Sequence, residues 1–205
     1  MHKSSGAAEP PQEDGGLRDR LVAVGAELVA SEGAQALTLR AIARGAGVSH
    51  GAPRRYFPTH LSLLSAIARR GFDELADHLA ARTAEADSQA DPRTQLHTLA
   101  RTYLDFARTH PGMYELMFRH DLLESGHLGL RETSLPLFGT LVGLVTRVRP
   151  RPAADPPAVA GALWANLHGI AQLWGWGSLQ LATGADDVEP LLRAALDAHL
   201  GPAPR

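Results

Sequence analysis

The stretch LTLRAIARGAGVSHGAPRRYFPTHLSLLSAIA, residues 37–68, carries the signals that decide how this 205-residue chain folds. It contains two short helical patterns separated by a break at Gly47. Thr38 offers a capping hydroxyl to the first pattern, and Ser49 offers one to the second. The second pattern ends before Pro58, because the residue preceding a proline avoids the helical conformation. The stretch therefore predicts two helices of about two turns each, joined by a tight turn.

Helical patterns also flank this stretch on both sides. Before it, apolar residues recur every three or four positions from Leu17 to Leu28, and Gly33 is a C-terminal stop signal. After it, Thr59 caps a longer helix that is expected to continue into the 80s. No stretch alternates apolar and polar residues as a half-buried strand does. The expected fold is all-α, with an N-terminal three-helix unit.

The charge of this region differs from that of the whole chain. The chain has a formal net charge of −2 and 20% charged residues, which is ordinary for a globular protein. Between Gly33 and Phe72, however, there is no Asp or Glu. The basic residues there are Arg40, Arg44, Arg54, Arg55, Arg69 and Arg70, together with His50 and His60. Two short helices in a basic stretch are typical of a DNA-binding helix-turn-helix. A generic helical hairpin in an arginine-biased chain is the alternative.

The stretch 37–68 and the helix before it resemble the DNA-binding domain of TetR (tetracycline-repressor-like) transcriptional regulators. The matching positions are Thr38, Ile42, Ala43, Gly47, Val48, Ser49, Tyr56, Phe57 and Leu64. The resemblance implies that the second short helix enters the major groove of double-stranded DNA, and that the ends of its neighbours bind phosphates. The residues that it places at the DNA are Thr38, Arg40, Ser49, His50, Gly51, Ala52, Arg54, Arg55, Tyr56 and His60.

Three residues depart from the family pattern. Arg54 stands where the family often has Tyr, and it is suited to a phosphate or to guanine. His60 stands where the family often has Lys; a neutral imidazole is expected to donate one hydrogen bond to a phosphate but to contribute less charge. Pro53 replaces an aliphatic residue and lacks an N–H, so the recognition helix is expected to begin tight or bent.

The remainder of the chain predicts further helices. Asp91 and Pro92 open one that His110 and Pro111 close, the next begins at Pro111, and a third covers about 135–148 before a proline-rich loop at 150–157. This part resembles the ligand-binding body of the same family. The residues expected to contact a small molecule are Tyr103, Met117, Phe118, Trp164 and His168. Plain core packing is the alternative for each of them.

Between Asp155 and Asp186 there are thirty residues without a charged side chain. A membrane span is not expected, because the run contains six polar side chains that hydrocarbon would leave unpartnered. Small residues recur at multiples of four, at Gly161, Ala165, Gly169 and Gly177, which suits a buried subunit interface. The run also resembles a C-terminal domain type named for Trp and His-Gly, and His168 is alternatively a hydrogen-bonded interface residue. The expected interface residues are Gly161, Ala165, Gly169, Gln172, Leu192, Ala195 and Leu196.

The chain has no cysteine, which excludes disulfides, thiolate metal sites and cysteine nucleophiles. It has no phosphate-binding loop and no histidine pair at i, i+3 or i+4, so no enzyme activity, metal or cofactor is expected. The expected parts are a disordered tail (1–16), a helix-turn-helix domain (17–62), a ligand-binding and dimerisation domain (63–200) and a tail (201–205). Together they predict a cytoplasmic homodimeric repressor that a small molecule releases from a palindromic operator. The alternative is a helical ligand-binding or interaction protein with a degenerate DNA-binding head.

Overall fold

The computed structural model describes residues 13–85, 91–119, 121–122, 129–148 and 155–202. Within these ranges every regular element is helical, which confirms the all-α prediction. The elements in chain order are α1 (Glu13–Glu32), η1 (Ala34–Ala36), α2 (Leu39–Gly45), η2 (Ala52–Arg55), α3 (His60–Glu85), α4 (Pro92–Thr109), α5 (Pro111–Met117), α7 (Leu130–Val148), α8 (Pro156–Gly175), α9 (Ser178–Thr183) and α10 (Glu189–Leu200).

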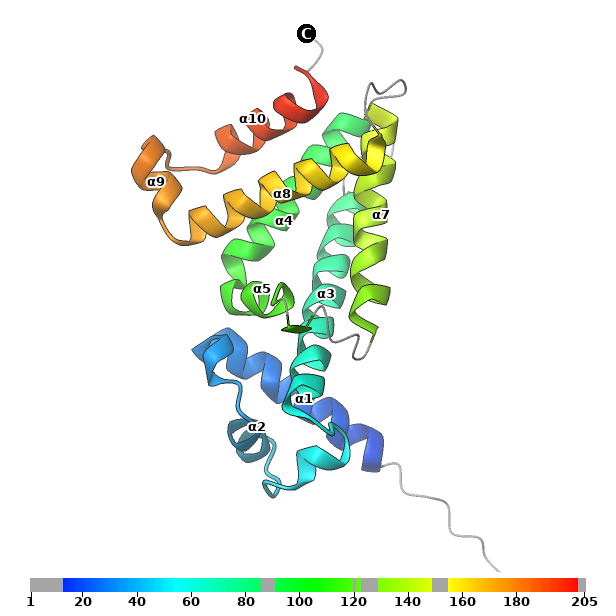
Figure 1. Cartoon of the computed structure of the whole chain (residues 1–205), viewed down its shortest axis with the longest axis vertical. Coiled ribbons are helices and arrows are strands. Elements are labelled where there is room, and N and C mark those ends of the chain that lie inside the picture. The colour runs from blue at the N-terminus through cyan, green and yellow to red at the C-terminus, as the bar shows by residue number, and fades with distance from the viewer. Residues whose placement is uncertain (1–12, 86–90, 120, 123–128, 149–154, 203–205) are drawn as a thin grey trace, which may run out of the picture.

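The N-terminal elements α1, α2, η2 and the first turns of α3 form a small head at one end of the molecule (Figure 1). Gly33 has φ 82°, in the left-handed region that favours glycine, and it ends α1 as predicted. The Thr38 hydroxyl accepts a hydrogen bond of 3.1 Å from the Ala41 amide and caps α2. The core of the head consists of Leu21, Ile42, Phe57, Leu63 and Ile67, all at most 1% exposed.

The second short helix differs from its prediction. It is the single-turn 3-10 helix η2, which begins after Gly51 rather than after Ser49 and has no side-chain cap. Pro53 lies in its first turn with its ring buried. Because proline lacks an N–H, it removes one of the bonds that a two-turn α-helix would need. The expectation of a tight start is confirmed, and the expected length is wrong.

The long helix α3 joins the head to the rest of the chain (Figure 1). Thr59 and Ser62 cap its start reciprocally: the Ser62 amide donates to the Thr59 hydroxyl at 3.0 Å, and the Thr59 amide donates to the Ser62 hydroxyl at 3.2 Å. This confirms the predicted cap. The boundary expected between residues 62 and 63 falls inside α3, so the head and the body share one continuous helix.

The body packs around α4, which is covered by α3, α7, α8 and α10 (Figure 1). Asp91 caps α4, and Pro111 opens α5, both as predicted. Residues 150–154 of the predicted proline-rich loop lie outside the described residues. The largest fully buried side chains of the body are Leu96, Phe106, Leu116, Met117, Leu122, Leu163 and Leu167.

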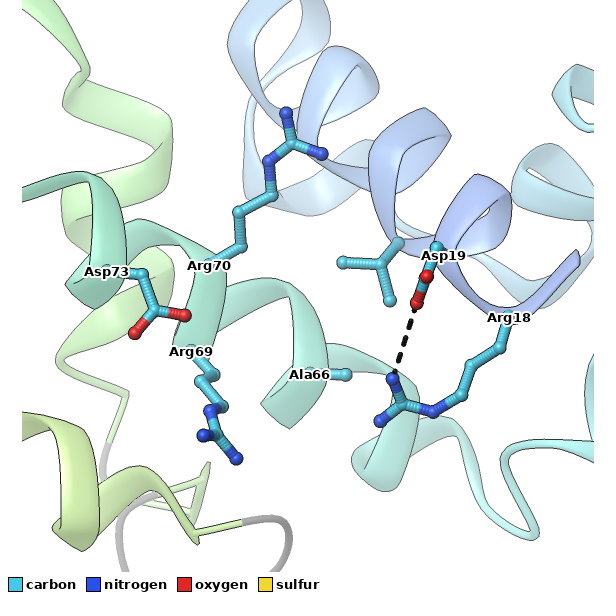
Figure 2. A pocket seen from close by; sticks show the side chains of 7 residues that line it. Arg18, Asp19, Ala66, Arg69, Arg70 and Asp73 are labelled. Carbon is cyan, nitrogen blue, oxygen red and sulfur yellow. Dashed lines mark ion pairs between the residues drawn. The ribbon is translucent and has the colours of Figure 1, made fainter. Parts of the chain in front are cut away.

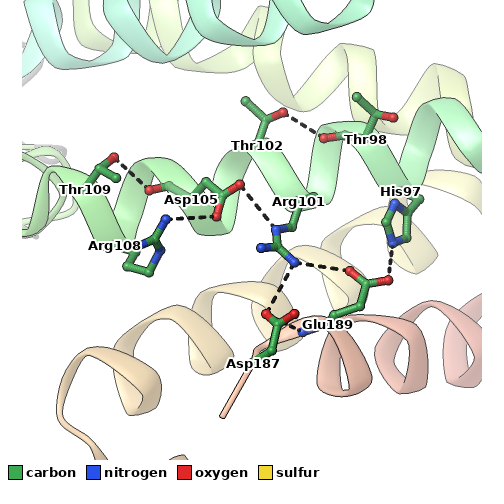
Figure 3. A network of polar contacts seen from close by, with 9 residues as sticks. All are labelled: His97, Thr98, Arg101, Thr102, Asp105, Arg108, Thr109, Asp187 and Glu189. Atoms are coloured by element: carbon green, nitrogen blue, oxygen red, sulfur yellow. Dashed lines mark hydrogen bonds and ion pairs between the residues drawn. The ribbon is translucent and has the colours of Figure 1, made fainter. Parts of the chain in front are cut away.

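A network of charged side chains fastens α10 and the residues before it to α4 (Figure 3). The Arg101 guanidinium donates to Asp105 at 3.2 Å, to Glu189 at 3.3 Å and to Asp187 at 3.4 Å. The His97 ring lies 2.9 Å from the Glu189 carboxylate. One arginine thus joins carboxylates from two parts of the chain that are more than eighty residues apart in sequence. This network fixes α10 against the body.

Candidate nucleic-acid interface and effector site

The residues predicted to meet DNA lie together at the free end of the head (Figure 1). Eight of the ten are exposed, and Ala52 and Tyr56 are half-buried. This surface is formed by α2, η2 and the start of α3. A partner that contacts all of it must therefore be large enough to reach three elements. The eight exposed residues are Thr38, Arg40, Ser49, His50, Gly51, Arg54, Arg55 and His60.

The arginines of this surface have no acidic partners within the part of the chain that the structure describes. Arg40, Arg54 and Arg55 are exposed and take part in none of the ion pairs found there. Arg44, in the last turn of α2, has the same character, although the sequence analysis did not select it. The acid-free stretch 33–72 was the signal that would have found it. These cations are available to bind phosphates.

His60, the first residue of α3, makes a contact that the sequence did not indicate. Its Nε2 lies 2.6 Å from the carbonyl oxygen of Leu37, in the turn before α2. A carbonyl oxygen only accepts hydrogen bonds, so Nε2 carries the hydrogen and donates it. The one N–H of a neutral imidazole is therefore used inside the protein. This differs from the expectation that it would donate to a phosphate.

The aromatic residues expected to contact a small molecule meet in the body, with one addition. The Tyr103 hydroxyl lies 2.8 Å from the Tyr114 hydroxyl, and both lie close to Nδ1 of His168, at 3.0 and 2.7 Å. The Trp164 indole N–H donates to the Tyr103 hydroxyl at 3.3 Å. We call Tyr103, Tyr114, Trp164 and His168 the aromatic cluster. Tyr114 was missed as a site residue because its spacing on α5 indicated only an apolar face.

Burial sets the protonation of the aromatic cluster. It raises the pKa of Tyr103 to about 12 and raises the pKa of Tyr114 as well. It lowers the pKa of His168 below its ordinary value, because the charged imidazolium is poorly solvated there. All three groups are therefore neutral near pH 7. A neutral His168 that accepts at Nδ1 carries its hydrogen on Nε2.

The remaining predicted ligand contacts divide into two kinds. Phe118 belongs with the aromatic cluster, since its ring centre lies 4.9 Å from those of Tyr114 and His168. Met117 is fully buried and packs towards α3 near Gly71, so the structure places it in the core. The burial of Met117 therefore supports core packing, which was the alternative to a ligand contact.

Two cavities lie away from the aromatic cluster. One of about 290 Å³ lies between α1 and α3 (Figure 2). Arg18, Arg69, Arg70, Asp19 and Asp73 supply its charged lining. The other, of about 300 Å³, lies between α4, α8 and α9. Neither is lined by a member of the aromatic cluster, whose side chains pack against one another.

The expected interface residues fall into two groups. Gly161, Ala165 and Gly169 are on the face of α8 opposite its buried residues, and a Cβ added at either glycine meets nothing within 4 Å. Gln172, on the same face, is half-buried. Gly177 lies beyond the end of α8, so it does not continue the strip. In contrast, Leu192, Ala195 and Leu196 are buried in the core of the single chain, which corrects their assignment to a subunit contact.

Both the head and the body of the chain match models of known protein families. Residues 96–199 match the model described as tetracyclin repressor-like, C-terminal domain. Residues 21–67 match the model described as bacterial regulatory proteins, tetR family. The first match alone spans half of the chain. The chain belongs to the TetR family. It has the helix-turn-helix head of this family of transcriptional regulators.

Curated relatives of this TetR-family chain include nucleoid occlusion factors named SlmA. The factor from Haemophilus ducreyi is 30% identical over 105 residues, which are 51% of this chain and 50% of that protein. The factor from Glaesserella parasuis is 28% identical over 142 residues, 66% of this chain and 69% of that protein. The chain thus spans about half the length of the first of these relatives.

Solved structures of similar proteins share the fold of this chain. A protein of unknown function from Rhodococcus sp. RHA1 is 28% identical with a TM-score of 0.71, covering 94% of this chain and 97% of that one. The multidrug binding protein EbrR, complexed with imidazole, is 25% identical with a TM-score of 0.60, covering 96% of this chain and 98% of that one. Among the described residues, no helix is both long and apolar enough to cross a membrane.

Proposed function

We propose that this TetR-family protein is a cytoplasmic homodimeric repressor that leaves a palindromic operator when a small molecule binds its body. The observation that carries the proposal is the exposed basic surface of the head, whose arginines have no acidic partners within the described residues. A surface of this kind binds the phosphate backbone, and the exposed residues between its arginines are free to meet base edges.

The uncharged outer face of α8 supports a second copy of the chain as partner. No charged side chain occurs from 156 to 175. Leu173 is 39% exposed and Trp176 is 72% exposed at one end of this face. An apolar face that a single subunit leaves in water is stabilised when another copy covers it. Two subunits would then present two heads to the two half-sites of a palindrome.

The helix α5 connects the aromatic cluster to the head. Tyr114 on α5 contacts His168, while Gly112 on α5 lies against α1 so closely that an added Cβ would be 2.5 Å from the Val29 carbonyl oxygen. A molecule that enters the aromatic cluster must displace Tyr114. Because Tyr114 is part of α5, this displacement moves α5. Because α5 has no free space against α1, its displacement changes the position of the head. A ligand that binds the protein more tightly when the head is in this changed position shifts the protein away from its DNA-bound form.

The chemistry of the aromatic cluster indicates the class of effector. Its rings favour a flat aromatic molecule, and the Nε2–H of His168 favours a hydrogen-bond acceptor on it. EbrR, which is described as a multidrug binding protein, holds imidazole. Imidazole combines a flat ring with a nitrogen acceptor, so it is a suitable first probe for this chain.

The experiment selects bound sequences from random duplex DNA and then measures affinity with and without the second half-site. Tight binding that requires both half-sites, and that weakens when an aromatic ligand binds the wild-type body, supports the proposal. The Arg54→Ala, Arg55→Ala double variant is the matched control for the head. If the protein binds a ligand but binds no DNA at any salt concentration, it is better described as a ligand-binding protein with a degenerate head.

A further inference from the structure

His60 lies at the DNA-facing end of the head and has one ring nitrogen already engaged. It is exposed, it is the first residue of α3, and its ring contacts the turn before α2. Its Nε2 donates to the carbonyl oxygen of Leu37 at 2.6 Å. Leu37 is itself buried and part of the core of the head. The hydrogen bond therefore fixes the imidazole on a rigid part of the head.

This hydrogen bond determines what the other nitrogen does. In the neutral ring only one nitrogen carries a hydrogen, and here it is Nε2. Nδ1 of the neutral ring has a lone pair and accepts hydrogen bonds. A phosphate oxygen also accepts, so the neutral ring has nothing to donate to it. Once Nδ1 is protonated, the ring donates from both nitrogens and carries a positive charge.

The short elements α2 and η2 of the head carry cationic side chains and no acidic ones. The first turn of α3 and the turn around Leu37 contribute no other titratable side chain, α2 contributes Arg40 and Arg44, and η2 contributes Arg54 and Arg55. The acidic residues of α1 with described side chains are Asp19, Glu27 and Glu32, and none forms an ion pair with His60. Within the described residues, no carboxylate forms an ion pair with this ring that DNA would have to displace.

We propose that His60 binds a DNA phosphate only as the imidazolium, through Nδ1–H, while Nε2–H stays on Leu37, so that operator affinity depends on pH. The proposal rests on the DNA binding proposed above. Imidazole side chains change charge between about pH 5 and 8, which makes this contact sensitive to cytoplasmic acidification. The expected result is tighter operator binding at pH 6 than at pH 8.

The expected effect is modest for each subunit and larger for a dimer. An exposed ion pair changes an equilibrium constant by up to about fivefold, so a dimer with two such rings gains up to about 25-fold between pH 8 and pH 6. Each phosphate contact also steepens the dependence of log affinity on log salt by about 1. A dimer should therefore show a salt slope that is steeper by about 2 at pH 6.

The test measures binding of the full chain to its selected palindromic duplex at pH 6 and pH 8, over a range of salt. His60→Lys carries a permanent charge and should bind at pH 8 as tightly as the wild type does at pH 6. His60→Gln keeps a donor for Leu37 but gains no charge, so it should bind at both pH values as the wild type does at pH 8. His50→Gln, at the other exposed histidine of the head, is the matched control and should keep the pH dependence.

Thermal unfolding at both pH values checks that each variant is folded. An unchanged pH dependence in His60→Gln and His60→Lys would overturn the proposal, as would its loss in His50→Gln alone. Wild-type binding that is tight but equal at pH 6 and pH 8 would overturn it while leaving the proposed repressor intact. If no duplex binds at either pH, both the proposed function and this inference are wrong.

Discussion

At the scale of single residues, the head separates groups that hold the structure from groups that face outwards. The hydroxyls of Thr38 and Thr59 hold the structure because they cap α2 and α3. Arg54 and Arg55 come from the single turn of η2 and are exposed. Because η2 is so short, it presents few base-contacting positions. We expect the arginines at its end to bind phosphates.

Replacing Arg54 by alanine tests this division. If Arg54 binds a phosphate, Arg54→Ala weakens binding to all sequences about equally and lowers the salt slope by about 1 per subunit. If it contacts guanine, the loss is about 1–3 kcal/mol and is confined to sites with that base. We expect the phosphate result. The exposed body residue Arg131 provides the control, since Arg131→Ala should change neither quantity. Undiminished affinity in the Arg54→Ala, Arg55→Ala double variant would show that these arginines are only solvated surface.

At the scale of elements, α5 contacts both the aromatic cluster and the head. The space between α5 and α1 admits a hydrogen at Gly112 but not a methyl group, since the neighbouring atom is a backbone oxygen of Val29. Backbone atoms inside a helix do not move aside as the end of a flexible side chain does. The fit of these two helices thus sets the position of the head relative to the body.

Gly112→Ala should therefore destabilise the protein by about 1–3 kcal/mol, as overpacking does. Gly139→Ala is the matched control, because a Cβ added there in α7 meets nothing within 4 Å. Alanine is favoured over glycine within a helix by about 0.5–1 kcal/mol, so the control should be stabilised. Urea unfolding at one fixed protein concentration measures both. Equal changes in the two variants would mean that α5 and α1 are not closely fitted.

At the scale of the whole molecule, α8 contributes both the open outer face and two members of the aromatic cluster, Trp164 and His168. His168 points into the cluster, whereas Gly169, the next residue, lies on the face left open by the single chain. A partner that covers this face would lie next to the proposed ligand site, because Gly169 directly follows His168 in the sequence. Association and ligand binding are therefore expected to be coupled.

Gly169→Leu should convert a dimer to a monomer or an aggregate while the head keeps its helices. The space around Gly169 is open in the single chain, so the added side chain obstructs a partner rather than the fold. Gly143→Leu on α7, where there is also open space, should stay dimeric. Light scattering measures the molar mass, and circular dichroism measures the helix content. A dimer in both variants would place the interface elsewhere.

The stability of the folded chain should also fall in acid because of His168. Its pKa is lowered in the folded state by burial, so the unfolded chain binds this proton more readily. The contribution is present above the ordinary imidazole pKa of about 6.5 and is lost as pH falls through the folded value. Urea unfolding between pH 7 and pH 5 should show this loss, and His168→Gln should reduce it. The same slope in both proteins would contradict the assignment.

The sequence by itself determined the helical class, the ends of most helices and the basic surface of the head. Caps, prolines and the left-handed glycine act on their immediate neighbours, so they are readable without knowing what packs where. A long acid-free stretch likewise stays basic in any fold. Only the tertiary structure decided which apolar faces are covered: Leu192 and Ala195 have the periodicity of an interface but lie in the chain's own core. It also decided the bonds of His60 to Leu37 and of Tyr114 to His168, which join residues 23 and 54 positions apart. Periodicity shows that a face must be buried, whereas its partner depends on how distant helices pack.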